Sequence, residues 1–134
     1  MKIFIDTNVL ISAARNPNGK PFLAFWKAVT YPNNGIICEQ NIDEIRRIFN
    51  QKFPHQIPLL EHFLAEILPH LLIAPIPTDE LDDEAKIRDI CDRPILRAAI
   101  TAGADVLITG DKDFLEADIK ALKVMAINEF LELH

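Results

Sequence analysis

Four acidic residues spread along the chain are the strongest candidates for chemistry. Asp6 directly follows an apolar run, and Asp111 comes just after a second run that ends at Thr109 and Gly110. Glu44 and Asp92 lie near the starts of two expected helices. Carboxylates that share a pocket repel one another, and a divalent cation between them relieves that repulsion. Oxygen-only ligands favour Mg²⁺ or Mn²⁺ over zinc, so this pattern predicts a metal site if the acids converge.

Each of these acids also has an ordinary structural explanation when it is taken alone. Asp6 and Asp92 are plausible turn or N-cap residues, because both types of position favour short acidic side chains. Glu44 fits a surface position on a helix, and Asp111 and Asp113 fit a loop. The prediction of a site therefore depends on whether the fold brings the acids together.

The elements that would position the acids alternate between strands and helices. Strands are expected at 2–5, 35–38, 71–76, 104–109 and 124–127, and helices at 21–29, 41–53, 58–68, 92–102 and 128–133. Residues 6–8 suggest a turn. The alternation predicts one α/β domain over residues 1–134, with a central parallel sheet covered by helices on both faces. Ligands of such sheets bind outside the carboxyl ends of the strands near the topological switch point, where Asp6 and Asp111 are expected.

Composition and charge limit the classes of protein that fit. The 134 residues are 49% hydrophobic and 25% charged, which is ordinary for one folded domain. The net charge of −6 argues against a general nucleic-acid coat. Cys38 and Cys91 are too few for a disulfide framework and fit a reducing cytoplasm. No apolar stretch has the length of a membrane span or a signal sequence, and the four histidines are scattered rather than clustered.

Four segments taken in order resemble the PIN-domain nucleases. They are I-D-T-N-V-L-I-S at 5–12, E-I at 44–45, D-x-x-I-L-x-A-A at 92–99 and A-D-V-L-I-T-G-D-K-D-F at 104–114. More narrowly, the chain looks like the VapC-like toxins of type II toxin–antitoxin pairs, from Lys2 to about Ile127. The resemblance implies a three-layer PIN-like sandwich with about five parallel strands. It also implies Mg²⁺- or Mn²⁺-dependent cleavage of RNA, homodimerisation and inhibition by a cognate antitoxin.

The same resemblance assigns roles residue by residue. It makes the acids at positions 6, 44, 92 and 111 the metal-binding and catalytic quartet, and it makes Asp113 an accessory ligand. Thr7 or Asn8, and the strand-end hydroxyl of Thr109, are expected to orient carboxylates or water. One departure is Cys38, because many relatives have serine about six residues before the helix glutamate. A hydrogen bond that supports the site is expected to be weaker there.

Basic residues stand beside these acids, as a metal site that admits a polyanion requires. Arg46 and Arg47 follow Glu44, Arg93 and Arg97 follow Asp92, and Lys112 follows Asp111. A solvated surface of mixed charge is the alternative explanation. From this set we predict that Arg97 or Lys112 contacts the phosphate of the RNA substrate.

Two other functions fit parts of the sequence. A HAD-like phosphatase also places an aspartate after its first strand, but its general acid two residues later would here be Asn8, which cannot exchange a proton at neutral pH. A non-catalytic PIN-fold module that acts through protein partners is the other alternative. Its interface would be the apolar helix that carries Leu59, Leu60, Phe63, Leu64, Ile67 and Leu68.

Overall fold

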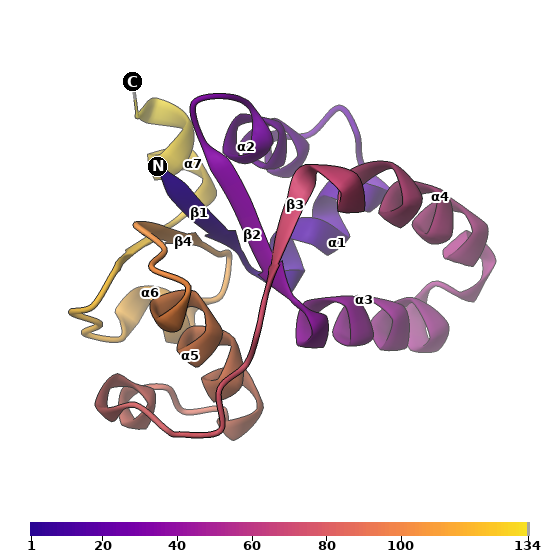
Figure 1. Ribbon diagram of the computed structural model, residues 1–134. Helices are drawn as coiled ribbons and strands as arrows, with labels where there is room; N and C mark the ends of the chain where they lie inside the picture. Colours follow the sequence, from indigo (N-terminus) through magenta and orange to yellow (C-terminus); the bar gives the residue numbers. More distant parts are fainter. Residues whose placement is uncertain (134) are drawn as a thin grey trace.

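The computed structural model describes residues 1–133 and is built around a five-stranded sheet in which every pairing is parallel (Figure 1). The strands are β1 (Lys2–Ile5), β2 (Asn34–Cys38), β3 (Leu71–Ala74), β4 (Val106–Ile108) and β5 (Lys123–Met125). Their order is β3-β2-β1-β4-β5, so the order reverses direction between β1 and β4. The predicted α/β sandwich with about five parallel strands is confirmed, and its topological switch point lies at the end of β1.

In the described residues, seven α-helices connect or follow the strands. They are α1 (Thr7–Arg15), α2 (Lys20–Val29), α3 (Glu39–Lys52), α4 (Ile57–Ile67), α5 (Arg93–Thr101), α6 (Lys112–Glu116) and α7 (Ile127–Glu132). Short 3₁₀ turns are η1 (Pro54–Gln56), η2 (Leu68–His70), η3 (Asp82–Lys86) and η4 (Ile90–Asp92). Within residues 1–133, no helix combines the length and the apolar character that a membrane crossing requires.

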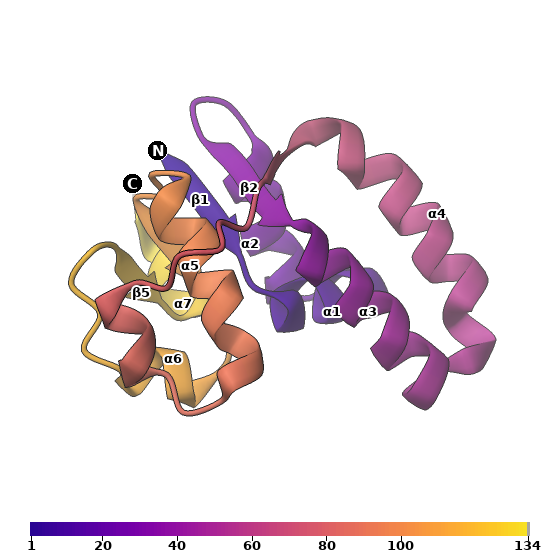
Figure 2. The same cartoon turned by 60° about the horizontal axis from the view of Figure 1, so that its bottom comes forward.

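The sheet separates two apolar cores because side chains alternate between its faces. In β1, Ile3 and Ile5 pack in one core, and Phe4 packs in the other. The first core contains buried residues of α1, α2, α3, α4 and α7, and the second contains those of α5 and α6. Figure 2 shows α5 and α6 on one side of the strands and α1, α3 and α4 on the other. The result is the predicted three-layer arrangement.

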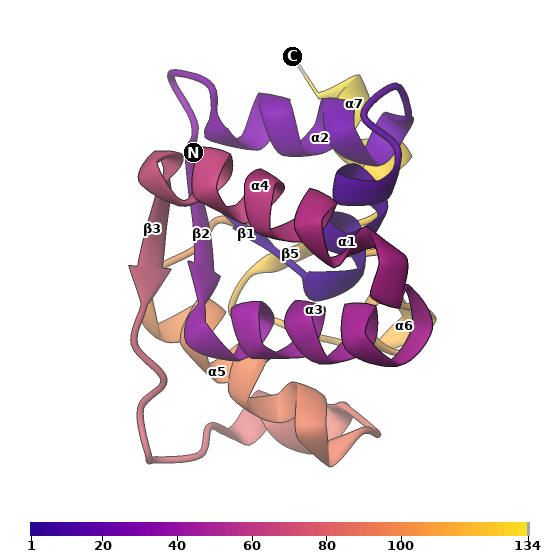
Figure 3. The same ribbon diagram turned by 90° about the vertical axis from the view of Figure 1, so that its right-hand side faces the viewer.

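Helices α3 and α4 lie side by side and extend away from the sheet (Figures 1 and 3). On α4, the side chains of Leu60, Leu64 and Ile67 are buried in the first core, so most of the apolar stripe on this helix serves packing. Leu59 is the large apolar residue of α4 that remains exposed. Helix α3 begins directly after β2, which places its first turns at the carboxyl edge of the sheet.

Candidate active site

Asp6 lies between the end of β1 and the first turn of α1, and its side chain is almost fully buried. Its Oδ1 accepts a hydrogen bond from the backbone N–H of Thr7 at 2.8 Å, which caps α1. Its Oδ2 accepts one from the hydroxyl of Thr109 at 2.7 Å and a longer one from the amide of Asn8 at 3.4 Å. These bonds fix the orientation of a carboxylate at the topological switch point.

The segment after β4 brings Asp111 to the same edge. The hydroxyl of Thr109 donates to Asp6 and also accepts the backbone N–H of Asp111 at 3.0 Å, so it links the ends of β1 and β4. The side-chain oxygen of Asn8 accepts the N–H of Gly110 at 3.1 Å across the same gap. Asp111 then caps α6 by accepting the N–H of Asp113 at 2.9 Å. The polar residues expected to orient the acids therefore do contact them.

Glu44 comes to this edge from the second turn of α3. Its Oε1 accepts a hydrogen bond from the amide of Gln40 at 2.7 Å. The same Gln40 nitrogen donates to the backbone carbonyl of Cys91 at 2.6 Å, directly before Asp92. Gln40 thus ties the helix that carries Glu44 to the turn that carries Asp92.

Asp92 occupies the N-cap position of α5, but its side chain makes no capping hydrogen bond. The second residue of this helix is Pro94, which has no N–H to be capped. The half-buried Asp92 carboxylate accepts no hydrogen bond from residues 1–133, so capping does not account for this acid.

The electrostatics show that these acids lie close enough to affect one another. The pKa of Asp6 is raised to about 6, chiefly by burial and also by the charges of Glu44 and Asp111, against the opposing hydrogen bonds from Thr109 and Thr7. Burial also raises the pKa of Asp92 to about 7, with contributions from Asp6, Asp89, Glu44 and Asp111. Among the ion pairs of residues 1–133, none involves one of the four acids.

This donor set fits a hard divalent cation, although it is not closed around one. No three acidic, histidine or cysteine side chains among residues 1–133 form a finished metal-binding cluster. Asp6, Glu44, Asp92 and Asp111 nevertheless lie near enough for their charges to raise the pKa values of Asp6 and Asp92. The Glu44 carboxylate is held by the amide of Gln40. Carboxylate oxygens without a basic partner among residues 1–133 are the kind of ligand that Mg²⁺ or Mn²⁺ prefers.

Two residues that help to build the site were not found from the sequence. Asn41 is fully buried, donates to the hydroxyl of Thr7 at 2.9 Å and accepts the N–H of Cys38 at 2.8 Å. The thiol of Cys38 also donates to Asn41 at 3.2 Å, so the hydrogen bond expected to be weakened is present. Gln40 is the other, and its spacing of four residues from Glu44 on one helix was a usable signal.

The two basic residues predicted to contact phosphate have different surroundings. The guanidinium of Arg97 is bound to Glu84 at 2.9 and 2.7 Å and to the carbonyl of Pro77 at 2.8 Å. The Arg97 side chain is 11% exposed and that of Glu84 is 4% exposed, so this ion pair is buried and does not favour a phosphate contact. Lys112, in contrast, is exposed directly after Asp111. Asp113 lies 3.9 Å from Arg88, a long ion pair at the protein surface.

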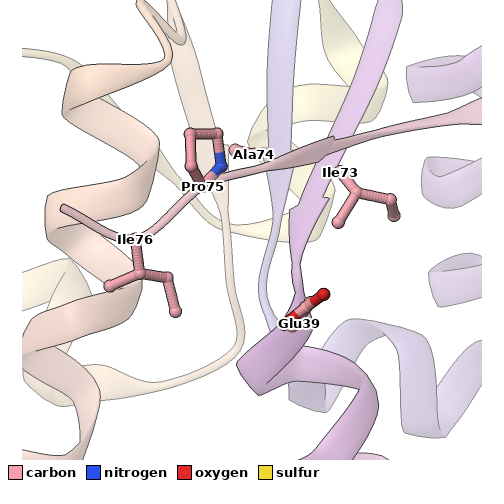
Figure 4. A pocket seen from close by; sticks show the side chains of 5 residues that line it. All are labelled: Glu39, Ile73, Ala74, Pro75 and Ile76. Atoms are coloured by element: carbon pink, nitrogen blue, oxygen red, sulfur yellow. The ribbon is translucent and has the colours of Figure 1, made fainter.

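Two hollows open near the carboxyl edge of the sheet. One, of about 370 Å³, lies between α3 and the start of α5 and includes Glu44. The other, of about 460 Å³, lies at the end of β3, where Figure 4 shows the Glu39 and Ile73 side chains beside the Ala74–Pro75 backbone. Glu39 lines the second hollow and is not among the groups that raise the pKa values of Asp6 and Asp92.

Similarity to known proteins is found among protein families and among solved structures. A family model described as PIN domain matches residues 2–113. No curated protein matches the chain significantly. Among solved structures, the chain is similar to one in the crystal structure of VapBC2 from Rickettsia felis bound to a DNA fragment from their promoter. The TM-score is 0.70 at 17% identity, covering 94% of this chain and 98% of that one. At this identity the likeness shows a shared fold.

Proposed function

The chain belongs to the PIN domain family, and from this premise we propose that it is a metal-dependent ribonuclease that hydrolyses RNA phosphodiester bonds. The observation that carries the proposal is the mutual electrostatic effect of Asp6, Glu44, Asp92 and Asp111, which have no basic partner among residues 1–133. A structural role does not account for such an arrangement, because burying like charges together raises the free energy of the folded state.

In this proposal, the four acids hold Mg²⁺ or Mn²⁺, and Asp113 assists from the first turn of α6. Divalent cations with oxygen ligands lower the pKa of bound water and offset the charge of a scissile phosphate. Thr7, Asn8 and Thr109 keep the Asp6 carboxylate in one orientation through the hydrogen bonds described above. Asp92 contributes two oxygens that accept no hydrogen bond from the described part of the chain, residues 1–133.

Lys112 is the proposed contact to substrate phosphate next to the acids. It is exposed and follows Asp111 at the start of α6. A cation at this position would raise the local concentration of a polyanion near an otherwise acidic edge. The buried ion pair of Arg97 with Glu84 makes Arg97 the weaker candidate of the two predicted residues.

We further propose that the protein is the toxin of a type II toxin–antitoxin pair, acts as a homodimer in the cytoplasm and is inhibited by a cognate antitoxin. The motif resemblance supports this assignment, and so does the fold likeness to a chain of the VapBC2 structure. Two free cysteines are compatible with a reducing compartment.

The direct test is hydrolysis of a mixed-sequence RNA pool by the purified protein. We expect cleavage with Mn²⁺ or Mg²⁺, none with EDTA, and recovery when metal is restored. Asp6→Asn should remove at least about 99% of the activity, because an amide cannot offset the charge of a cation. Asp79→Asn is the matched control, since Asp79 is exposed in the loop before η3. Cleavage that persists in EDTA or in Asp6→Asn would contradict the proposal.

A further inference from the structure

The hollow that includes Glu44 runs along α3. Its volume of about 370 Å³ falls in the range of sites that hold small molecules, roughly 300–1,000 Å³. The residues that line it come from the first three turns of α3, from η4 and from the start of α5: Gln40, Asp43, Glu44, Arg47, Cys91 and Pro94. The hollow thus contains one proposed metal ligand, Glu44, and one basic residue, Arg47.

Two neighbouring arginines of α3 differ in what they bind. The guanidinium of Arg46 makes two hydrogen bonds to Glu61 on α4, at 3.0 and 3.2 Å. Arg47 is exposed and lines the hollow, and its side chain makes no ion pair or hydrogen bond among residues 1–133. It stands three residues after Glu44, so both side chains project from neighbouring positions on one face of the helix.

From this geometry, and on the basis of the proposed nuclease function, we propose that the hollow binds the RNA backbone beside the scissile bond and that Arg47 contacts a phosphate there. A guanidinium presents a planar set of donors that matches phosphate oxygens. Glu44 lines the hollow and belongs to the proposed metal site, so the neighbouring phosphate of a strand bound at that site would come near Arg47.

Arg47 is the basic residue among those that line the hollow, so the proposed phosphate contact depends on it. Asp43 and Glu44 line the same space, so without Arg47 its charged side chains would all be acidic. A phosphate in the hollow would then meet charged side chains of its own sign only. Loss of Arg47 should therefore weaken substrate binding more than loss of an average surface arginine.

The experiment compares Arg47→Ala with Arg46→Ala. The second variant removes the same charge from the neighbouring residue, whose side chain pairs with Glu61 and does not line the hollow. The substrate is the oligonucleotide cleaved fastest from the mixed-sequence RNA pool, with Mn²⁺ present at several salt concentrations. Arg47→Ala should raise KM about tenfold with little change in kcat. The salt dependence of log(kcat/KM) should become shallower by about 0.7, the value for one phosphate contact on a single strand.

Arg46→Ala should stay within about twofold of the wild type in KM, and Arg47→Lys should recover part of the lost affinity because it restores the charge. Mn²⁺ binding measured by calorimetry should be equal in all variants. If Arg47→Ala matches Arg46→Ala in KM and salt dependence, the inference is overturned while the nuclease function stands. Reduced Mn²⁺ affinity in Arg47→Ala would also overturn it. A wild type that cleaves no RNA would remove both the function and the inference.

Discussion

At the scale of single residues, the four acids differ in what their oxygens already bind. Asp6 and Asp111 cap helices, and they also lie near enough to the other acids for their charges to interact. A structural role as a cap is therefore compatible with the proposed role as a metal ligand. Asp92 stands at a cap position without capping. Strand ends are recognisable from apolar runs, so the sequence could place Asp6 after β1 and Asp111 after β4, at the same edge of the sheet. It did not predict Asn41, because nothing in a lone asparagine after a strand indicates full burial.

We predict that Asp6→Asn stabilises the metal-free protein at pH 7 even as it removes activity. The pKa of Asp6 is raised to about 6, so keeping its carboxylate ionised at neutral pH costs the folded state free energy. A neutral amide avoids this cost, and the gain should be on the order of 1–3 kcal/mol. Urea unfolding of both proteins in EDTA measures it. Equal or lower stability of Asp6→Asn would mean that the Asp6 carboxylate is not under electrostatic stress.

At the scale of elements, five strands and five helices lie where the hydrophobic pattern places them, within a few residues at each end. The turn predicted at 6–8 is wrong, because α1 begins at Thr7. Asp6 directly follows β1 and is the N-cap of α1, so no separate turn lies between them. The same residue types favour turns and helix caps, so the sequence alone does not distinguish the two. Helix α6 has only five residues and follows a Gly-Asp pair, so it resembled a loop.

Arg97 and Lys112 illustrate why the roles of basic residues were harder to predict than those of acids. Arg97 joins α5 to η3 through its buried ion pair with Glu84, a partner 13 residues away whose approach depends on the path of an irregular segment. We predict that Arg97→Ala lowers the melting temperature by on the order of 5 °C or more, because Glu84 is left as a buried charge without a partner. Differential scanning fluorimetry measures this effect.

Lys112→Ala is the companion variant and should leave the melting temperature within about 1 °C, while it raises KM for RNA. A melting temperature that falls equally in both variants would contradict this division of roles. Weaker RNA binding in Arg97→Ala at unchanged stability would restore the original prediction for Arg97.

At the scale of the whole molecule, the fold gathers uncompensated acids at one edge of the sheet while it pairs acids elsewhere. The pKa values of Glu84, Asp83 and Glu61 lie below their ordinary values, chiefly because of hydrogen bonds from Arg97, Lys86 and Arg46 respectively. Only Asp6 and Asp92 among the acids of residues 1–133 have clearly raised pKa values. The ionised forms of Glu84, Asp83 and Glu61 stabilise the fold, whereas the ionised forms of Asp6 and Asp92 destabilise it.

The raised pKa values of Asp6 and Asp92 predict how the stability of the metal-free protein depends on pH. Asp6 and Asp92 have higher pKa values in the folded state than the value of 3.8 for a free side chain, so folding is favoured when they are protonated. Their contribution is complete below pH 3.8 and is lost as the pH rises through about 6 and about 7. Acids with lowered pKa values have the opposite effect on stability, but only below their pKa values in the unfolded state. Their contribution to the free energy of unfolding is therefore constant between pH 5 and 7.

We therefore expect the free energy of unfolding in EDTA to decrease from pH 5 to pH 7.5. Saturating Mn²⁺ should reduce or reverse that decrease, since it binds the ionised acids of the folded state. Asp6→Asn combined with Asp92→Asn should flatten the profile without metal. A wild-type profile that is flat or rises over this range would show that the acids are not coupled in solution.

The most direct test of the central claim is an anomalous difference map from a crystal of the protein soaked in Mn²⁺. We expect a peak about 2.1 Å from carboxylate oxygens of Asp6 and of at least one of Glu44, Asp92 and Asp111, as hard oxygen ligands would give. A map in which Mn²⁺ is bound at other carboxylates while this edge of the sheet holds none would contradict the account.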